Sequence, residues 1–216
     1  MLRKIRSLLI SASAWNDSAY PLLRHVEAND DFHVIEKLLN KRGYTPNLEI
    51  AEAFGETPLI KACQLGNEET VRLLIQYGAN LNARSSPGMT PIMHAAECTG
   101  AYSYIHLVPK RQIFLENGTI WAEVPRGANH RECISWLALA GADINAQDKY
   151  GFTALMYSVG LPDLVEELLM RGATVNIRNA DDRTALEIAL HGRSGTAREA
   201  WFPQSAELIR RAGGEL

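Results

Sequence analysis

Apolar residues recur along the chain in short stripes with helical spacing, and the stripes end at glycines. Val71 and Leu74 belong to one such stripe, which stops before Gly78, and similar stripes stop before Gly141 and Gly172. Residues three or four apart share one face of a helix, and glycine favours the left-handed conformation that ends one. The pattern therefore predicts short helices, each with one buried face, that repeat along the chain.

A shorter helix is predicted ahead of each stripe. Four threonines mark where these helices open: Thr57, Thr90, Thr153 and Thr184. A threonine hydroxyl can accept a free backbone N–H at a helix N-terminus. Proline follows two of the threonines, at Pro58 and Pro91, and suits a first turn, where no N–H is needed. The chain is thus expected to consist of repeated helix pairs.

The opening segments of these pairs have closely similar sequences. They read TPLIKA from Thr57, TPIMHA from Thr90 and TALMYS from Thr153. They resemble ankyrin repeats, whose unit of about 33 residues has a T-P-L-H-x-A core. The resemblance implies an all-α fold, an ankyrin repeat solenoid of about five helix-turn-helix repeats with a β-hairpin-like insertion in the third. The linker GADINAQDKYGFTAL resembles those of bacterial ankyrin repeat proteins in style.

The repeat register also predicts how the chain is divided. Residues 1–17 are expected to be an N-terminal helical extension, and 18–216 a single ankyrin repeat domain. The expected repeats are 18–50, 51–84, 85–147 (with an insertion at 100–128), 148–178 and 179–216. The two terminal repeats match weakly, as is expected of repeats that cap a stack. For the N-terminal segment, a signal sequence is the alternative to a helix.

One position departs from the family pattern in four of the five expected repeats. The signature histidine is replaced by Ile60, Met93, Met156 and Glu187. The resemblance therefore implies that the hydrogen bond made by that histidine between repeats is absent or replaced by packing.

The insertion in the third repeat carries a β-hairpin signal in the stretch QIFLENGTIWAEV, residues 112–124. Asn117-Gly118 suits a two-residue turn in which both residues need positive φ. This pairing places Phe114 opposite Trp121, either turned partly outward toward a partner or packed on tyrosines of the same insertion. Because the fifth repeat is also long, two rims are expected to flank a notch at 160–162.

Composition narrows the classes of function. The net charge is −3 without a basic block, so a nucleic-acid footprint is not expected. No apolar run is long enough to span a membrane. The chain has three cysteines. A small, odd number of cysteines argues against a disulfide framework and favours a reducing compartment. The protein is therefore expected in the cytoplasm, with no cofactor, no membrane and no nucleic-acid partner.

A metal site is the sharpest chemical alternative. His94 and Cys98 lie one helical turn apart, and His130 and Cys133 follow on the next predicted helix. Four nitrogen and sulfur ligands could suit zinc. The simpler interpretation places His130 at a helix opening and Cys133 in the core.

The resemblance implies a non-enzymatic protein–protein interaction scaffold, expected to be a monomer. A partner protein would be bound through the turn tips, the concave helix face and the insertion, with inhibition of a toxin or effector (an immunity role) as one specialisation. The candidate partner-binding residues are Phe54, Glu56, Leu65, Arg84, Met89, Phe114, Trp121, Lys149, Tyr150, Phe152, Arg178, Arg183 and Trp201. The alternatives are an enzyme or metal-binding protein with its site at the insertion, and a self-associating array.

Overall fold

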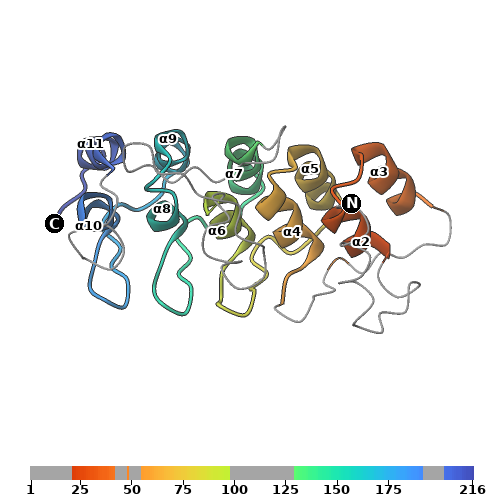
Figure 1. Ribbon diagram of the computed structural model, residues 1–216, viewed down its shortest axis with the longest axis horizontal. Helices are drawn as coiled ribbons and strands as arrows, with labels where there is room; N and C mark the ends of the chain where they lie inside the picture. The colour runs from red at the N-terminus through yellow and green to blue at the C-terminus, as the bar shows by residue number, and fades with distance from the viewer. Residues whose placement is uncertain (1–20, 42–47, 49–54, 98–128, 192–201) are drawn as a thin grey trace, which may run out of the picture.

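The computed structural model describes residues 21–41, 48, 55–97, 129–191 and 202–216, and this part of the chain forms ten α helices and no strand. Helices are labelled as in Figure 1 and follow one another in five pairs. The pairs are α2 (Pro21–Glu27) with α3 (Phe32–Leu39), α4 (Pro58–Leu65) with α5 (Glu68–Gln76), α6 (Pro91–Ala96) with α7 (His130–Leu139), α8 (Ala154–Tyr157) with α9 (Pro162–Met170), and α10 (Ala185–His191) with α11 (Pro203–Arg211).

The pairs stack side by side into two layers (Figure 1). In the inner layer α2, α4, α6, α8 and α10 contact one another in chain order, and in the outer layer α3, α5, α7, α9 and α11 do the same. The turns that join successive pairs project from the inner layer, on the side away from the outer helices. This is the predicted solenoid, and none of its described helices is long and apolar enough to cross a membrane.

Threonines open four of the inner helices, as predicted. The hydroxyls of Thr57, Thr153 and Thr184 accept the backbone N–H three residues further on, at 3.3, 3.4 and 3.3 Å. Thr90 is likewise the N-cap of its helix, α6, but its buried hydroxyl has no hydrogen-bond partner. The sulfur of Met93 instead accepts the Thr90 N–H at 3.4 Å.

The position of the family's histidine has two different roles here. Ile60, Met93 and Met156 are 0–1% exposed, so packing replaces the hydrogen bond, as predicted for these repeats. Glu187 behaves differently, because its carboxylate accepts the backbone N–H of Thr184 at 2.7 Å. Together with the threonine hydroxyl it forms a capping box that satisfies two free N–H groups of α10.

The apolar stripes form one continuous core between the layers. The stripe residues Val71, Leu74, Ile134, Leu137, Val165 and Leu168 are fully buried. Gly78, Gly141 and Gly172 close the outer helices with φ of 83°, 94° and 91°, which is the left-handed conformation expected at these ends. Burial of the shared stripes is what holds neighbouring repeats together.

Three asparagines add a ladder of hydrogen bonds between repeats. Each lies four residues after the glycine that ends an outer helix, and its side-chain oxygen accepts a backbone N–H of the next repeat. The bonds join Asn82 to Asp143 at 2.9 Å, Asn145 to Thr174 at 2.8 Å and Asn176 to Glu215 at 2.8 Å. Equal bonds at equal register keep the repeats at one spacing.

The two helices on either side of the predicted insertion are described. Helix α6 ends at Ala96, and α7 begins at His130 with Asn129 as its N-cap. The Asn129 N–H donates to the carbonyl oxygen of Gly66 at 2.7 Å, which fixes the point where the chain rejoins the stack. The predicted hairpin at 112–124, the N-terminal extension at 1–17 and the rims around the notch lie outside the described residues.

Candidate protein-binding surface

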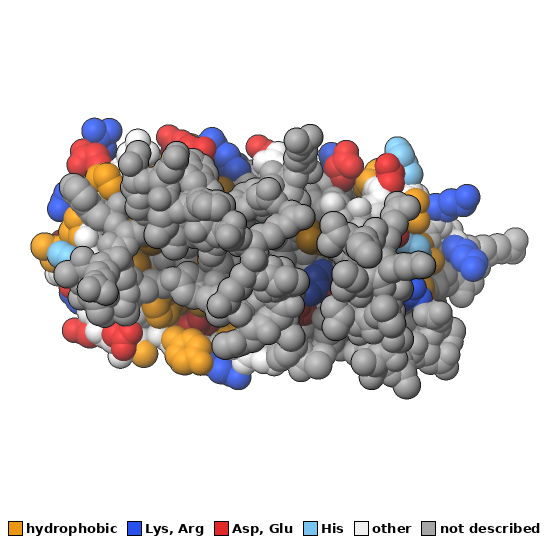
Figure 2. Space-filling view, in the orientation of Figure 1, with side chains coloured by type: hydrophobic (Ala, Val, Ile, Leu, Met, Phe, Trp, Pro, Cys, Tyr) orange, Lys and Arg blue, Asp and Glu red, His pale blue; other side chains and the backbone are white. Residues whose placement is uncertain are grey.

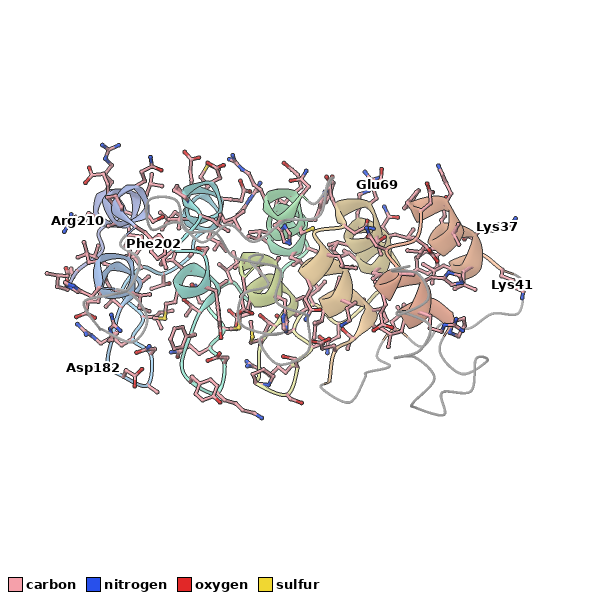
Figure 3. The ribbon with its side chains drawn as sticks, viewed as in Figure 1. Lys37, Lys41, Glu69, Asp182, Phe202 and Arg210 are labelled. Carbon is pink, nitrogen blue, oxygen red and sulfur yellow. The ribbon has the colours of Figure 1, made fainter. Side chains whose placement is uncertain are left out.

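In the described part of the chain, three hairpin turns lie on the edge of the molecule opposite the outer helices (Figure 1). Each is closed by a backbone hydrogen bond of 3.0 Å and contains one residue with positive φ. The closing bonds run from Ser85 to Met89, from Asp148 to Phe152 and from Asn179 to Arg183. The positive-φ residues are Gly88, Gly151 and Asp182, at 86°, 76° and 61°. Asp182 is labelled at its turn in Figure 3.

Neighbouring turns are also bonded to each other through their backbones. The Lys149 N–H donates to the Pro87 carbonyl oxygen at 3.1 Å, and the Ala180 N–H donates to the Tyr150 carbonyl oxygen at 2.9 Å. At Gly151 the approach is so close that an added Cβ would lie 2.8 Å from the Ala180 nitrogen. The turns therefore form one continuous ridge, called here the turn ridge (residues 84–89, 147–152 and 178–183).

Long side chains at the start of each turn bridge along the turn ridge. Arg84 donates to the carbonyl oxygens of Gly88 at 2.9 Å and Gln147 at 2.8 Å. The Gln147 side chain donates to the carbonyl oxygens of Gly151 at 2.8 Å and Arg178 at 2.9 Å. The Arg178 side chain donates to the Leu216 carbonyl oxygen at 3.2 Å. The candidate residues Arg84 and Arg178 are thus exposed but already engaged in holding the ridge together.

The side chain of Tyr150 projects from the middle of the turn ridge. It is 63% exposed, and its register equivalents in the neighbouring turns are Pro87 and Asp181. Lys149 beside it is exposed and donates its Nζ to the Ser86 carbonyl oxygen. Hydrophobic, acidic and basic side chains all appear along this edge in Figure 2.

Two other candidate residues near Tyr150, Met89 and Phe152, face inward. Met89 is 4% exposed. Phe152 is half-buried and packs on Tyr157 with ring centroids 5.6 Å apart, and the Tyr157 hydroxyl donates to Asp148 at 2.6 Å. Of the candidates Met89, Tyr150 and Phe152, Tyr150 is the one whose side chain a partner can cover.

Glu56 belongs to a buried polar cluster near the first turn. It is 7% exposed and pairs with the Lys61 ammonium at 2.5 Å, and Gln64 donates to its second oxygen at 2.8 Å. The same Gln64 nitrogen lies 3.3 Å from His94 Nδ1, while His94 Nε2 lies 3.1 Å from the Ser85 hydroxyl. A neutral imidazole that accepts from Gln64 and donates to Ser85 satisfies this network.

The electrostatics of the cluster follow from burial and from the Lys61 charge. Burial lowers the pKa of His94 to about 4, although the Glu56 charge opposes this shift. Burial also acts to raise the pKa of Glu56, but its hydrogen bond to Lys61 and the charge of that ammonium outweigh it, so the pKa lies below its ordinary value. The cluster therefore holds a neutral histidine beside an ion pair at neutral pH.

The two histidines of the candidate zinc site have other partners in the structure. His94 is held as described above, and His130 Nε2 lies 3.3 Å from the Gln64 carbonyl oxygen. Cys133 is fully buried, and burial raises the pKa of its thiol to about 12. Within the described ranges no group of three or more His, Cys, Asp or Glu side chains could hold a metal, and Cys98 lies outside those ranges.

The remaining candidates are dispersed. Leu65 is half-buried at the end of α4, and Arg183 is half-buried and donates to the Glu187 carbonyl oxygen at 3.3 Å. Four candidates lie outside the described residues: Phe54, Phe114, Trp121 and Trp201. The sequence reasoning missed the bridging role of Gln147, although its equivalence to Arg84 and Arg178 in the repeat register was a usable signal.

Comparisons with known proteins agree with this architecture. The family model described as ankyrin repeats (3 copies) matches residues 22–113 and 122–199. The chain is 27% identical over 79% of its length to human SH3 and multiple ankyrin repeat domains protein 2. It is 30% identical over 73% to ankyrin repeat domain-containing protein SAT10 of Stachybotrys chartarum, and 32% identical over 74% to the chicken nuclear factor NF-kappa-B p105 subunit.

These relatives are much longer than the chain. The matched region spans 9%, 8% and 16% of the three proteins, respectively. The similarity therefore concerns the repeat region that the proteins share.

Proposed function

Because the chain belongs to the ankyrin repeat family, whose repeats generally serve as protein–protein interaction modules, we propose that it binds a partner protein through its turn ridge. Exposed Tyr150, on a ridge fixed by backbone and side-chain bonds, is the observation that carries this proposal. Tyrosine is enriched at the energetic centres of interfaces, where its ring is buried and its hydroxyl can find a partner.

Rigidity of the ridge favours binding. A loop that is already ordered loses little conformational entropy when it meets a partner. Here Gln147 and Arg84 tie consecutive turns before any partner arrives. We propose that Lys149, with Arg183 and the concave ends of the inner helices, contributes the polar rim around Tyr150.

The finer parts of the proposal rest on the family resemblance and on the composition of the sequence. They are a non-enzymatic monomer in the cytoplasm that inhibits a toxin or effector, with the insertion at 100–128 as a second contact. The alternative, an enzyme or metal-binding site at that insertion, falls outside the described residues and stays a prediction.

The proposal can be tested by affinity capture from cells of the source organism. Tagged full-length chain should retain a specific protein, and Tyr150→Ala should reduce the retained amount several-fold. Trp121→Ala tests the insertion in parallel. Tyr77→Ala, which removes a tyrosine that is 36% exposed on the outer side, is the matched control.

Two outcomes decide between the functions. Equal capture by wild type and Tyr150→Ala would show that the turn ridge is not the interface. Stoichiometric zinc in the purified chain, lost together with partner capture on chelation, would favour the metal-site alternative.

A further inference from the structure

The outer layer has four seams, and three of them, between α5 and α7, α7 and α9, and α9 and α11, join helices whose closing glycines are all described. Equivalent positions on the outer helices are found by counting residues back from the glycine that ends each helix. The residue ten before the glycine on one helix faces the residue five before it on the next. These facing pairs are Glu68 with Trp136, Arg131 with Glu167, and Pro162 with Leu208.

Side chains close the first two seams. The indole N–H of Trp136 donates to Glu68 at 3.3 Å. Arg131 donates to the buried carboxylate of Glu167 at 3.1 Å, and Arg171 crosses the same seam to the Ser135 hydroxyl at 2.8 Å. Each of these seams is filled by a polar bridge between neighbouring repeats.

The third seam is open. Its facing pair, Pro162 and Leu208, has no side chain able to form a hydrogen bond, and Ala212 stands where the neighbouring seam has Arg171. In the described part of the chain no side-chain hydrogen bond crosses from α9 to α11. A groove of about 490 Å³ remains between the two helices, lined by Pro162, Pro203 and Leu208 together with polar side chains.

Acidic side chains surround this apolar floor. Asp163 and Glu166 line the groove from α9, and Glu207 and Arg211 line it from α11. Arg211 already pairs with Glu207 at 2.8 Å, whereas Glu166 has a distant cation, Arg131, at 3.9 Å. The lining therefore carries a net negative charge over an apolar floor. Charged side chains are seen along this upper edge over α9 and α11 in Figure 2.

We propose that the α9–α11 groove is a second docking site, which takes a cationic amphipathic segment of a partner protein. Apolar side chains of that segment would cover Leu208 and the two prolines, and its Lys or Arg groups would meet Asp163 and Glu166. The groove lies on the outer layer, whereas the turn ridge lies on the opposite edge (Figure 1). Both sites can therefore be occupied at the same time.

The register supplies a matched pair of variants for a test. Asp163 and Glu69 both stand nine residues before the closing glycine and in the first turn of an outer helix. Glu69, labelled in Figure 3, belongs to the closed α5–α7 seam. Asp163→Lys and Glu69→Lys therefore make the same change in net charge and in interaction with the helix dipole, but only Asp163→Lys alters the groove.

The probe is a fluorescent helical peptide with leucines on one face and arginines on the other, titrated into the full chain by anisotropy. Its counterpart has glutamates in place of the arginines. The arginine peptide should bind and the glutamate peptide should not. Asp163→Lys should weaken binding about tenfold, the change given by about 1.4 kcal/mol, and Glu69→Lys should leave it within about twofold.

A second variant tests the shape of the groove without changing net charge. Pro162→Arg with Leu208→Glu introduces the Arg131–Glu167 pair into the open seam and should abolish peptide binding. Equal weakening by the two lysine variants would mean non-specific attraction and overturn the proposal. If the Pro162→Arg, Leu208→Glu variant folds and binds the peptide with wild-type affinity, the proposal is also overturned. It is likewise overturned if the peptide does not bind and the chain instead self-associates in a way that Asp163→Lys abolishes.

Discussion

Gln147 in one turn donates its side-chain Nε2 to the carbonyl oxygen of Arg178 in the next turn, at 2.9 Å. The same nitrogen donates to the Gly151 carbonyl within its own turn at 2.8 Å. One side chain thus shapes a turn and sets its distance from the following turn. Because Arg84 does the same at the equivalent position, and Arg178 joins the last turn to the Leu216 carbonyl oxygen, the turn ridge is a bonded structure rather than three independent loops.

Gln147→Ala should lower the free energy of unfolding by about 1–2 kcal/mol, since two hydrogen bonds at an exposed site are each worth about 0.5–1.5 kcal/mol. Urea denaturation measures the change. Gln204→Ala is the control, because this exposed glutamine on α11 makes no side-chain hydrogen bond within the described structure, and it should shift stability by less than about 0.5 kcal/mol. Equal effects of both variants would contradict the bridging role.

Substitution of Gly151 and Gly172 by alanine can distinguish backbone strain from steric overlap with the neighbouring turn. Both have positive φ, at 76° and 91°, where a side chain costs about 1–2 kcal/mol. A Cβ at Gly151 would lie 2.8 Å from the Ala180 nitrogen, whereas a Cβ at Gly172 meets nothing within 4 Å.

Gly151→Ala should therefore destabilise the protein by about 1–3 kcal/mol more than Gly172→Ala, through overpacking between turns. Thermal and urea unfolding of the two variants provide the comparison. If Gly172→Ala were the more damaging substitution, the close contact between the turns would be refuted.

The buried His94 predicts a pH dependence of stability. Its pKa is about 4 in the folded protein and 6.5 in the unfolded chain, so between these values the unfolded state binds more protons. Stability should be fully present above about pH 6.5 and fall as pH drops toward 4, by at most about 3 kcal/mol at about 1.4 kcal/mol per pH unit. The lowered pKa of Glu56 acts in the same direction at the acidic end.

His94→Gln should flatten this dependence between pH 6.5 and 4 when unfolding free energy is measured across the range. His33→Gln, which removes an exposed imidazole, provides the control and should follow the wild-type curve. An unchanged slope in His94→Gln would show that the cluster does not hold a neutral histidine.

The closed α7–α9 seam predicts a difference between two glutamates. Glu167 is 4% exposed and accepts from Arg131 at 3.1 Å and Arg171 at 2.8 Å. Glu167→Ala should cost about 2–3 kcal/mol, because a buried carboxylate loses its hydrogen bonds to two guanidinium groups. Glu207→Ala, which removes an exposed pair with Arg211, should cost less than about 0.5 kcal/mol. Similar losses measured in urea would contradict the bridging role of Glu167.

Much of the fold could be predicted because its signals are local and repeated. The glycines at 78, 141 and 172 and the threonines at 57, 153 and 184 each appear with the expected conformation or hydrogen bond. Thr90 deviates, since the Met93 sulfur sits where a side-chain oxygen would normally satisfy the helix start. The methionine sulfur accepts this N–H only because of how Met93 packs, and the repeat pattern does not encode that packing.

The candidate surface was harder to predict, because exposure and partners are set by the neighbouring repeat. A turn position identifies Tyr150 and Met89 as equally good candidates, yet they are 63% and 4% exposed. The register likewise places Glu56 near a turn tip, but Lys61 from the next helix draws it into a buried pair. Tertiary contacts decide these differences, and they separate residues that hold the ridge from the residue that projects from it.

The central claim is that a partner covers the turn ridge at Tyr150. A photo-reactive benzophenone amino acid can replace Tyr150, or Leu139 on the outer layer, which is 64% exposed, in the full chain expressed in its source cells. After illumination, the probe at position 150 should yield a covalent adduct with one partner protein, and the probe at position 139 should not. An adduct formed from position 139, with none from position 150, would contradict the account.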